Sequence, residues 1–310
     1  MFIRVIGSSL FKCLHEFSRA RQGAHLQFPC RARSCHGNSN FLHPVMLGSD
    51  PRMSGHKHRR RKSCYHSNPT SLTRLQCTQN GAIRGEEIST IKQFILDNTV
   101  VTRNHLTPEV ALRLMTSSCR LWSAPSEQSS SILAHCGIDE PFWAFYWPGG
   151  QALTRYLLDN PGVVSGKSVL DVGSGCGASA IAAALVGAKS VLANDIDKVA
   201  IQAVKLNAEM NSVAMTTTSR NLIGRLADHW DVVLLGDMFY DKDFTDTVTD
   251  WLRCLADRGT EVLIGDPGRI FLRDHPVRDC LVNIFTVDLS ESCRLENNGM
   301  TQGFVWKLQA

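Results

Sequence analysis

The sequence predicts an α/β fold in which a seven-stranded sheet carries helices on both faces and closes with an antiparallel hairpin at its C-terminal end. Three observations support this fold. Short apolar runs rich in Val, Ile and Leu recur through the second half of the chain, as buried strands do. Longer segments with helical spacing separate most of them. Several runs end in glycine or an acid, and open α/β sheets place their sites beyond the carboxyl ends of such strands.

The expected elements occupy residues 86–310. Helices are predicted at 86–98, at 151–158, 178–186, 198–210 and 244–256, and strands at 169–172, 190–195, 214–219, 231–236, 261–265, 280–288 and 303–308. Thr107-Pro108-Glu109 resembles a cap followed by a first-turn proline and acid, and predicts a further helix through Met115. Residues 123–137 lack periodicity and are predicted to form a loop.

The amino-terminal third differs from the rest in charge. Residues 1–85 hold fourteen Lys and Arg against two acids, a net charge of +12, whereas the remainder carries −8. Within residues 1–36, apolar side chains such as Ile3, Ile6 and Leu10 share one helical face, and Arg4 and Lys12 fall on the other. This composition is typical of a mitochondrial transit peptide, so we expect a location in the mitochondrial matrix.

Residues 37–85 are polar and basic, with a run of charges from Lys57 to Lys62. A disordered linker or insertion is expected, because the segment holds too little apolar surface to fold. A nuclear signal or a nucleic-acid arm is the alternative, but no aromatic residues interleave with the charges. The eleven cysteines form no C-x-x-C pair, so reduced thiols and no metal site are expected. No apolar run reaches the roughly 18 residues of a membrane span, so no membrane insertion is expected.

A glycine turn at Val169 to Gly177 follows the first strand of the sheet. Glycine lets the backbone approach a ligand and adopt positive φ. Gly173, Gly175 and Ala178 satisfy a dinucleotide fingerprint, so a nicotinamide enzyme is one interpretation. Asp171 favours another, because a carboxylate two residues before the first glycine suits a cationic ligand better than a phosphate. A purely structural turn is the third interpretation.

The second strand ends in Asp195, where a carboxylate could accept hydrogen bonds from two ribose hydroxyls. With Asp171 and the glycine turn, this pattern resembles the Rossmann-like, seven-strand methyltransferases that use S-adenosylmethionine. The resemblance implies that the cofactor contacts Asp171, Asp195 and the turn residues Gly173, Ser174, Gly175 and Gly177. It also implies adenine contacts at Asn221 and Leu222, where related enzymes often carry an acid, and a contact at Gly236.

Two further segments narrow the resemblance to protein lysine methyltransferases. Trp147 precedes Pro148-Gly149-Gly150, a corner where a flat ring can cover a nucleoside. A buried strand ends at Asp237-Met238-Phe239-Tyr240, so Asp237 is expected to meet the substrate amine and Tyr240, with Phe239 or Trp147, to offer a ring face to the ammonium. The alternative is that Asp237 merely caps the next helix.

The expected reaction is methyl transfer from a sulfonium to a lysine amine. Free lysine has a pKa of about 10.4, so its neutral form is scarce at neutral pH. An adjacent sulfonium would lower that pKa and Asp237 would raise it. Asp237 is therefore expected to bind and aim the amine, and no general base is visible, so solvent is expected to take the proton.

The resemblance is strongest to the mitochondrial lysine methyltransferases that modify the β subunit of the electron transfer flavoprotein. It extends over residues 86–310, including residues 147–153, 193–197, 236–241 and 264–269, and departs at 37–85 and 126–131. It implies a monomer with a protein substrate and no nucleic acid, and weaker electron transfer to partner dehydrogenases after methylation. Another mitochondrial protein, a ribosomal protein or a small molecule remain alternative substrates, and a non-catalytic binding module remains an alternative class.

Overall fold

A computed structural model describes residues 85–136, 138, 140–297 and 299–309. The helices are α2 (Gly85–Asn98), α3 (Arg120–Ser123), α4 (Ser126–Cys136), α5 (Pro148–Asp159), α6 (Ala178–Leu185), α7 (Lys198–Met210), α8 (Lys242–Ala256), α9 (Ile270–Arg273) and α10 (Glu291–Glu296). The strands are β1 (Val100–Thr102), β2 (Leu112–Leu114), β3 (Ser168–Val172), β4 (Ser190–Asn194), β5 (Thr216–Thr218), β6 (Val232–Gly236), β7 (Glu261–Asp266), β8 (Leu281–Asp288) and β9 (Gln302–Leu308).

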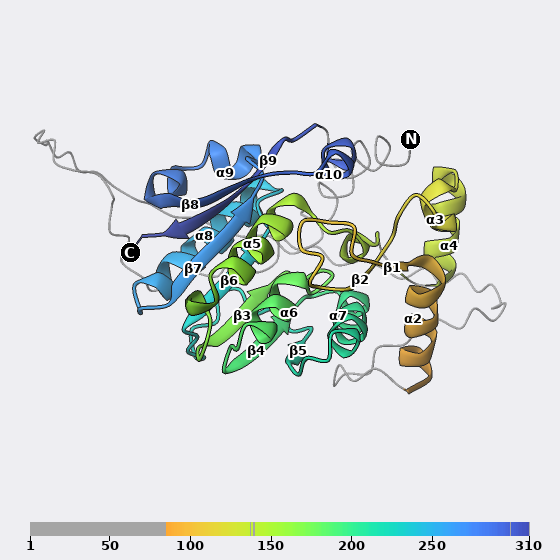
Figure 1. Cartoon of the computed structure of the whole chain (residues 1–310), viewed down its shortest axis with the longest axis horizontal. Coiled ribbons are helices and arrows are strands. Elements are labelled where there is room, and N and C mark those ends of the chain that lie inside the picture. Colours follow the sequence, from red (N-terminus) through yellow and green to blue (C-terminus); the bar gives the residue numbers. More distant parts are fainter. Residues whose placement is uncertain (1–84, 137, 139, 298, 310) are drawn as a thin grey trace, which may run out of the picture.

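Seven of these strands form one sheet in the order β5-β4-β3-β6-β7-β9-β8 (Figure 1). The first five are parallel, and β9 pairs antiparallel with both β7 and β8. The predicted α/β class, the seven strands and the antiparallel C-terminal hairpin are confirmed. The strand order reverses at β3, so the ends of β3, β4 and β6 face one crevice, where such sheets bind ligands.

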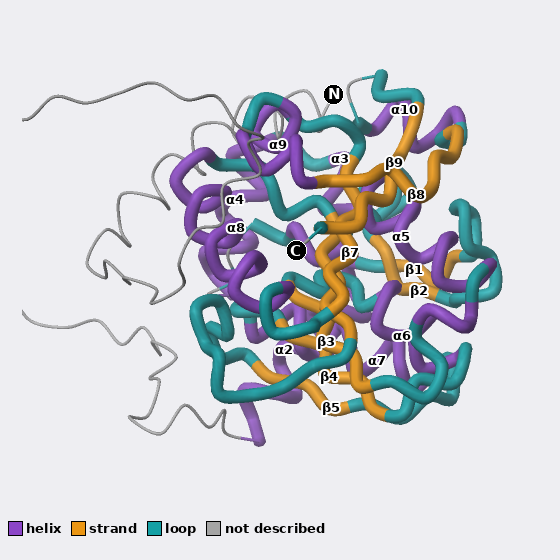
Figure 2. The backbone as a smooth tube through the Cα atoms, turned by 90° about the vertical axis from the view of Figure 1, so that its left-hand side faces the viewer, coloured by secondary structure: helices purple, strands orange, loops and turns teal. Residues whose placement is uncertain are grey.

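Helices cover both faces of the sheet, as Figure 2 shows with the strands edge-on. Side chains alternate between faces along a strand. Val169 of β3 packs in the core beneath α5 and α6, with Leu153 and Ile181. Its neighbour Leu170 packs on the opposite side, in the core that includes Trp251 of α8. The sheet is therefore buried on both faces, and its functional groups are confined to the strand ends.

Two elements were wrongly predicted. Residues 107–115 form a turn and strand β2 rather than a helix. The Thr107 hydroxyl is hydrogen-bonded to the Tyr146 hydroxyl and the His105 ring, so it does not cap a helix. Their backbone binds the side chains of α7: Asn207 accepts from the Arg113 amide at 2.9 Å. Residues 126–136 form helix α4 rather than a loop. Because the segment is rich in serine, its sequence did not reveal the apolar side that packs in the core containing Leu133.

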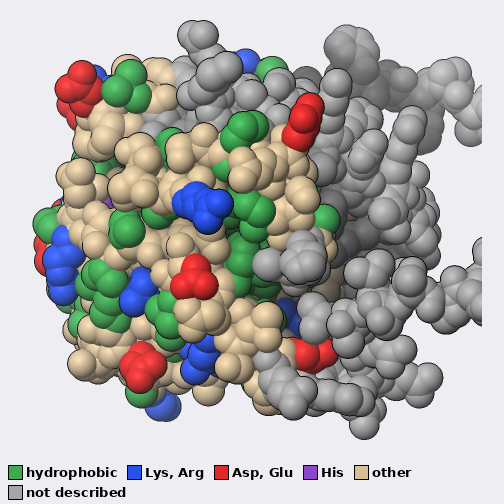
Figure 3. Space-filling view, turned by 90° about the vertical axis from the view of Figure 1, so that its right-hand side faces the viewer, with side chains coloured by type: hydrophobic (Ala, Val, Ile, Leu, Met, Phe, Trp, Pro, Cys, Tyr) green, Lys and Arg blue, Asp and Glu red, His purple; other side chains and the backbone are tan. Residues whose placement is uncertain are grey.

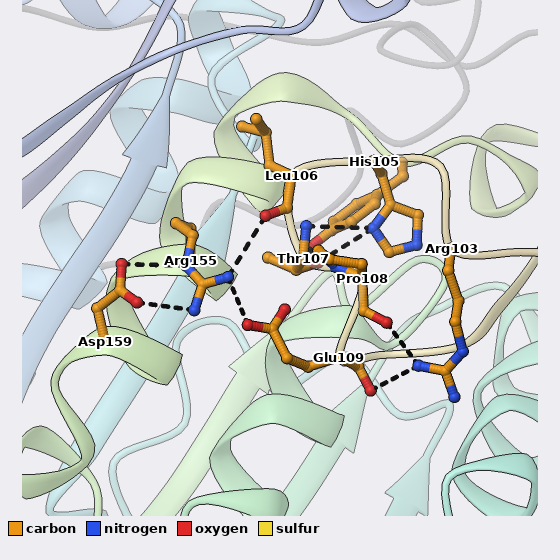
Figure 4. Close-up of polar contacts among 9 residues, drawn as sticks. Arg103, His105, Leu106, Thr107, Pro108, Glu109, Arg155 and Asp159 are labelled. Carbon is orange, nitrogen blue, oxygen red and sulfur yellow. Dashed lines mark hydrogen bonds and ion pairs between the residues drawn. The ribbon is translucent and has the colours of Figure 1, made fainter.

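The segment before β2 is fixed to α5 by a network around Arg155 (Figure 4). The Arg155 guanidinium forms ion pairs with Glu109 at 2.8 Å and Asp159 at 2.7 Å, and bonds the Leu106 carbonyl. The amide of Leu106 donates in turn to the Gln151 side chain. These contacts hold α5, which carries Trp147 at its start, against the amino-terminal part of the domain.

Three further expectations concern the amino-terminal segments, the cysteines and membrane insertion. The predicted transit peptide and all of the predicted linker except Gly85 lie outside the described residues. The expectation of reduced thiols throughout is wrong for Cys254 in α8 and for Cys280 just before β8, because both are disulfide-bonded. None of the helices in the described ranges combines the length and apolar character needed to span a bilayer.

Candidate active site

A pocket opens at the carboxyl ends of β3 and β6, beside the first turns of α5 and α6. Its lining comprises Phe145, Tyr146, Trp147, Gly150, Asp171, Gly173, Ser174, Gly175, Cys176, Ala178, Ser179 and Gly236. Six of these were predicted from sequence: Trp147, Asp171, Gly173, Ser174, Gly175 and Gly236. Segments about 90 residues apart in the chain, such as those of Phe145 and Gly236, therefore meet at one edge of the sheet, as the sheet topology requires.

The glycine turn after β3 has the backbone that only glycine adopts readily. Gly173, Gly175 and Gly177 all have positive φ, at 65°, 52° and 83°. A Cβ on Gly173 would also lie 2.1 Å from the Met238 sulfur. Asn207 of α7 braces the turn by donating to the Cys176 carbonyl at 2.8 Å. Gly177 lies behind the pocket as the N-cap of α6, packed against Val204.

Asp171 supplies a buried carboxylate to the pocket. The side chain is 2% exposed, and its Oδ2 atom has no hydrogen-bond partner within the described chain. Burial raises the pKa of Asp171 to about 7. A buried acceptor without a partner is costly in a folded protein. This oxygen therefore marks where a donor, and above all a cation, would be stabilised.

Asp195 lies just beyond β4 and ties the two strand ends together. Its Oδ2 accepts from the Gly175 amide and its Oδ1 from the Asp197 amide, both at 3.0 Å. Burial raises the pKa of Asp195. Each carboxylate oxygen can accept about two hydrogen bonds, so each retains one position for a hydroxyl donor. Asp197 caps α7 by accepting from the Val199 amide at 2.7 Å.

The start of α5 is packed backbone to backbone against the ends of β6 and β7. A Cβ on Gly149 would lie 2.3 Å from the Gly265 carbonyl oxygen, and one on Gly265 would lie 2.1 Å from the Gly149 carbonyl oxygen. Gly236 approaches the Gly150 backbone in the same way. Trp147, half-buried at the N-cap of α5, is fixed by its indole N–H, which donates to the Phe142 carbonyl at 3.0 Å.

Asp237 follows β6, and both of its carboxylate oxygens already accept hydrogen bonds. Oδ2 accepts from the Gly150 amide at 2.9 Å, while Oδ1 accepts from Nε and Nη2 of Arg269 at 3.0 and 2.7 Å. Its φ of 56° is unusual for a residue other than glycine. Asp241 caps α8, through the Phe244 amide, so Asp237 is not merely the cap of that helix.

Arg269 and Asp266 complete the part of the site around Asp237. Sequence reasoning gave Arg269 no role. Asp266 is fully buried, and its Oδ1 shapes the loop by accepting from the Gly268 and Arg269 amides at 2.7 and 2.8 Å. Burial and the Asp237 charge raise the pKa of Asp266 to about 7. The Arg269 guanidinium lies 5.9 Å from the centre of the Trp147 ring. The acids at the strand ends could be identified from the sequence. Their pairing with Arg269 could be seen only in the folded structure.

The aromatic residues after Asp237 face different ways. Tyr240 is exposed and stacks on Phe244, with ring centres 5.3 Å apart. Phe239 is fully buried in the core beside α8, so the expectation that its ring could face a substrate is wrong. The two predicted adenine contacts lie off the pocket lining: Asn221 is exposed and accepts from the Ile223 amide, and Leu222 is buried in the same core.

The residues present fit S-adenosylmethionine. The unpartnered oxygen of Asp171 suits a cationic group, and the free positions on Asp195 suit vicinal hydroxyls. The glycine turn between them leaves no side chain between its backbone and a ligand. Asp171 lines the pocket and Asp195 adjoins it through the Gly175 amide, so the site combines acceptors for positive charge and for ribose. The anionic diphosphate that a nicotinamide dinucleotide would place over such a turn gains nothing from the Asp171 charge.

Comparison with known proteins adds three findings. Residues 151–235 match the family model described as ribosomal protein L11 methyltransferase (PrmA). Electron transfer flavoprotein beta subunit lysine methyltransferases are 49% identical over 220 residues in Danio rerio (70% of this chain, 83% of that protein) and 48% identical over 222 residues in Homo sapiens (71% and 82%). A solved ribosomal protein L11 methylase from Lactobacillus delbrueckii subsp. bulgaricus is 19% identical, with a TM-score of 0.39, over 52% of this chain and 80% of that one.

Proposed function

Because this chain belongs to the family of electron transfer flavoprotein beta subunit lysine methyltransferases, we propose that it methylates lysine side chains of that flavoprotein subunit with S-adenosylmethionine as donor. The proposal includes a location in the mitochondrial matrix, reached through residues 1–36, and a catalytic domain spanning residues 86–310. The observation that carries it is the placement of two buried acids at the carboxyl ends of the paired strands β3 and β6: Asp171 lines the pocket with the glycine turn, and Asp237 follows the pocket residue Gly236.

The site has a cofactor half, around Asp171, and a substrate half, around Asp237, and the two have different tasks. Asp171, Asp195 and the turn at Gly173 hold the cofactor, and Trp147 covers it from the start of α5. When bound, S-adenosylmethionine supplies a methyl group whose bond to sulfur breaks as a bond to the lysine nitrogen forms, leaving S-adenosylhomocysteine. Asp237 accepts a hydrogen bond from the lysine amine and orients its lone pair, which is positioning catalysis.

The lysine must reach Asp237 as the neutral amine. A carboxylate beside an amine favours its charged form, whereas burial disfavours it. In this site the lysine loses its proton to solvent before entering, because Asp266, the acid beside Asp237 in the described part of the chain, is fully buried and cannot carry a proton outward. Tyr240, exposed beyond Asp237, offers a ring face to the approaching side chain.

The outer surface suits a protein substrate better than a nucleic acid. On the face in Figure 3, Lys and Arg side chains are interspersed with acids and apolar groups over the part drawn in colour. Residues 86–310 have a net charge of −8. A nucleic-acid enzyme would be expected to gather basic side chains on one face instead. We propose that the domain acts as a monomer.

The direct test is mass spectrometry of purified flavoprotein after incubation with the full chain and S-adenosylmethionine. Methylated lysines on the β subunit are expected with the wild type and with Asp243→Asn, an exposed control on α8. Asp237→Asn should remove most of the product. Ribosomal protein L11 serves as the competing substrate, since the family model of its methyltransferase also matches. Methylation of L11 with none on the flavoprotein would overturn the substrate assignment.

Location is tested separately by a fluorescent protein fused after residue 40. Import requires the basic amphipathic segment at residues 1–36. Co-localisation with a matrix marker is expected, and replacing Arg4 and Lys12 by glutamate should leave the fusion in the cytosol. A diffuse cytosolic signal from the unmodified segment would contradict the matrix location.

A further inference from the structure

The Asp237 carboxylate has a restricted capacity for substrate. A carboxylate offers about four acceptor positions. Arg269 occupies two of them through Nε and Nη2, both on Oδ1, and the Gly150 amide occupies one on Oδ2. One position on Oδ2 is left for an incoming donor. An ammonium has three N–H groups and gains most from several acceptors, whereas a neutral amine that keeps its lone pair free needs only one.

The charge around Asp237 is also largely compensated. Arg269 contributes a full positive charge 2.7 Å from Oδ1. The start of α5 contributes the partial positive charge of its amide groups at Oδ2, and residues 148–151 of that helix carry no charged side chain. Other charged groups at the carboxyl ends of these strands include Asp266, whose raised pKa leaves it only partly ionised near neutral pH, Asp171 in β3 and Asp195 beyond β4.

Arg269 is built into this position rather than placed by chance. The Asp266 carboxylate holds its backbone amide at 2.8 Å, and Trp147 lies beside the guanidinium plane. Burial lowers the pKa of Arg269, but the Asp237 and Asp266 charges raise it by more, so the guanidinium stays charged. Its side chain is 22% exposed and that of Asp237 is 4% exposed, so the pair is shielded from solvent.

From this geometry we propose that Arg269 is a positioning residue for methyl transfer: by neutralising Asp237 and filling one of its oxygens, it makes the pocket select the neutral lysine amine over the ammonium. The inference rests on the proposed function and deepens it. Without Arg269, Asp237 would present a full negative charge to the substrate. The lysine would then bind as an ammonium, whose nitrogen has no lone pair, and would need higher pH to react.

The pH profile of methyl transfer distinguishes this role from a structural one. Arg269→Gln should shift the alkaline-rising limb of kcat, which reports groups in the enzyme–substrate complex, upward by about one pH unit, as expected when a neighbouring charge is removed. At pH 7 kcat should fall about tenfold while KM for the flavoprotein stays the same or falls, and kcat should approach the wild-type value near pH 9.5. Arg269→Lys keeps the charge without the planar fork and should shift the profile by less.

Arg273→Gln is the matched control, because Arg273 lies four residues further on, is exposed and pairs only with its neighbour Asp274 among the ion pairs found in residues 85–309. Its profile should coincide with that of the wild type. Retained thermal stabilisation of Arg269→Gln by S-adenosylhomocysteine shows that the variant is folded. A wild type that methylates the flavoprotein, together with an Arg269→Gln loss that is equal at every pH, overturns the role of Arg269. A wild type that transfers no methyl group overturns the proposed function instead.

Discussion

Two buried carboxylates at neighbouring strand ends, Asp171 near the end of β3 and Asp237 after β6, are satisfied in opposite ways. Asp171 has an oxygen with no hydrogen-bond partner in the described chain, and burial raises its pKa to about 7. Asp237 accepts three hydrogen bonds, two of them from the Arg269 guanidinium. Both are less than 10% exposed. Burial is therefore similar, and the difference lies in whether the protein supplies the compensating charge itself.

The difference shows how one strand edge serves two ligands. The cofactor brings its own positive charge, so its half of the site leaves an acid uncompensated until binding occurs. The substrate must arrive neutral, so its half of the site compensates the acid in advance. An enzyme gains in rate only from interactions that favour the transition state over the bound substrate, and an Asp237 that held the ammonium tightly would favour the wrong state.

The largest effect is expected from a substitution that disrupts only the substrate half of the site. Asp237→Asn keeps the shape of the side chain but removes the charge that pairs with Arg269, so the amine loses its alignment. We expect kcat to fall on the order of 100-fold. Affinity for S-adenosylhomocysteine, measured by calorimetry, should stay within about threefold of the wild type. A comparable loss of cofactor affinity would show that the two halves are not separable.

The next effect concerns stability without cofactor. Because the native pKa of Asp171 lies above its unfolded value of 3.8, the native state holds this proton more tightly. The resulting stability is complete below about pH 4 and is lost as pH rises through 7. We expect the wild type to lose on the order of 3 kcal/mol relative to Asp171→Asn between pH 4 and pH 8.

That difference is measured by urea unfolding of both variants across the pH range. Comparing variants cancels the contributions of other acids, including Asp266, whose pKa is also raised, and Glu261, whose pKa is lowered. Parallel stability curves for the two proteins would show that Asp171 is not the uncompensated acid described above.

A smaller effect tests the turn that separates the two acids. Gly173→Ala places a Cβ against the Met238 sulfur and requires a positive φ, so we expect a loss of about 1–2 kcal/mol in stability and about tenfold in cofactor affinity. Gly259→Ala is the matched control: its φ is also positive, but nothing lies within 4 Å of the added Cβ. Stability can be followed by thermal unfolding. Equal loss of cofactor affinity in both variants would remove the role given to Met238.

The smallest effect concerns the edge of the substrate half. Tyr240 is exposed and stacks on Phe244 rather than on the pocket residues. Tyr240→Phe keeps the ring and should change kcat/KM by less than about twofold, whereas Tyr240→Ala should raise KM about fivefold by removing a ring face. Initial rates on purified flavoprotein measure both. A larger effect of the phenylalanine variant would show that the hydroxyl itself takes part in the reaction.

The sequence predicted those parts of the molecule that local patterns determine. The strand and turn around Asp171 and the helices at 178–186 and 198–210 depend on residues close together in the chain, and all are present. The predicted helix at Thr107 failed because the partners of that segment, Asn207 and Asn211, lie about 100 residues away. A local cap signal cannot anticipate such competition.

The same limit explains which site residues sequence reasoning missed. Asp237 was identified from its strand end, but its partner Arg269 is 32 residues further on, and nothing in the sequence of its loop indicates that the two side chains pair. The close packing of Gly149 on Gly265 joins segments 116 residues apart. Asn221 was chosen by analogy with an acid at the corresponding strand end, and the structure turns its side chain toward its own loop. Proximity to a strand end therefore predicts candidates, whereas their partners require the fold.

The central claim is that Asp171 has no compensating charge until the cofactor binds, whereas Arg269 compensates the charge of Asp237 within the protein. Calorimetric affinity for S-adenosylmethionine, measured without the flavoprotein from pH 5 to pH 9, tests it directly in the wild type, Asp171→Asn and Asp237→Asn. We predict that affinity rises through pH 7 in the wild type and in Asp237→Asn, as Asp171 ionises, and stays low and flat in Asp171→Asn. A pH dependence that persists in Asp171→Asn and disappears in Asp237→Asn would contradict the claim.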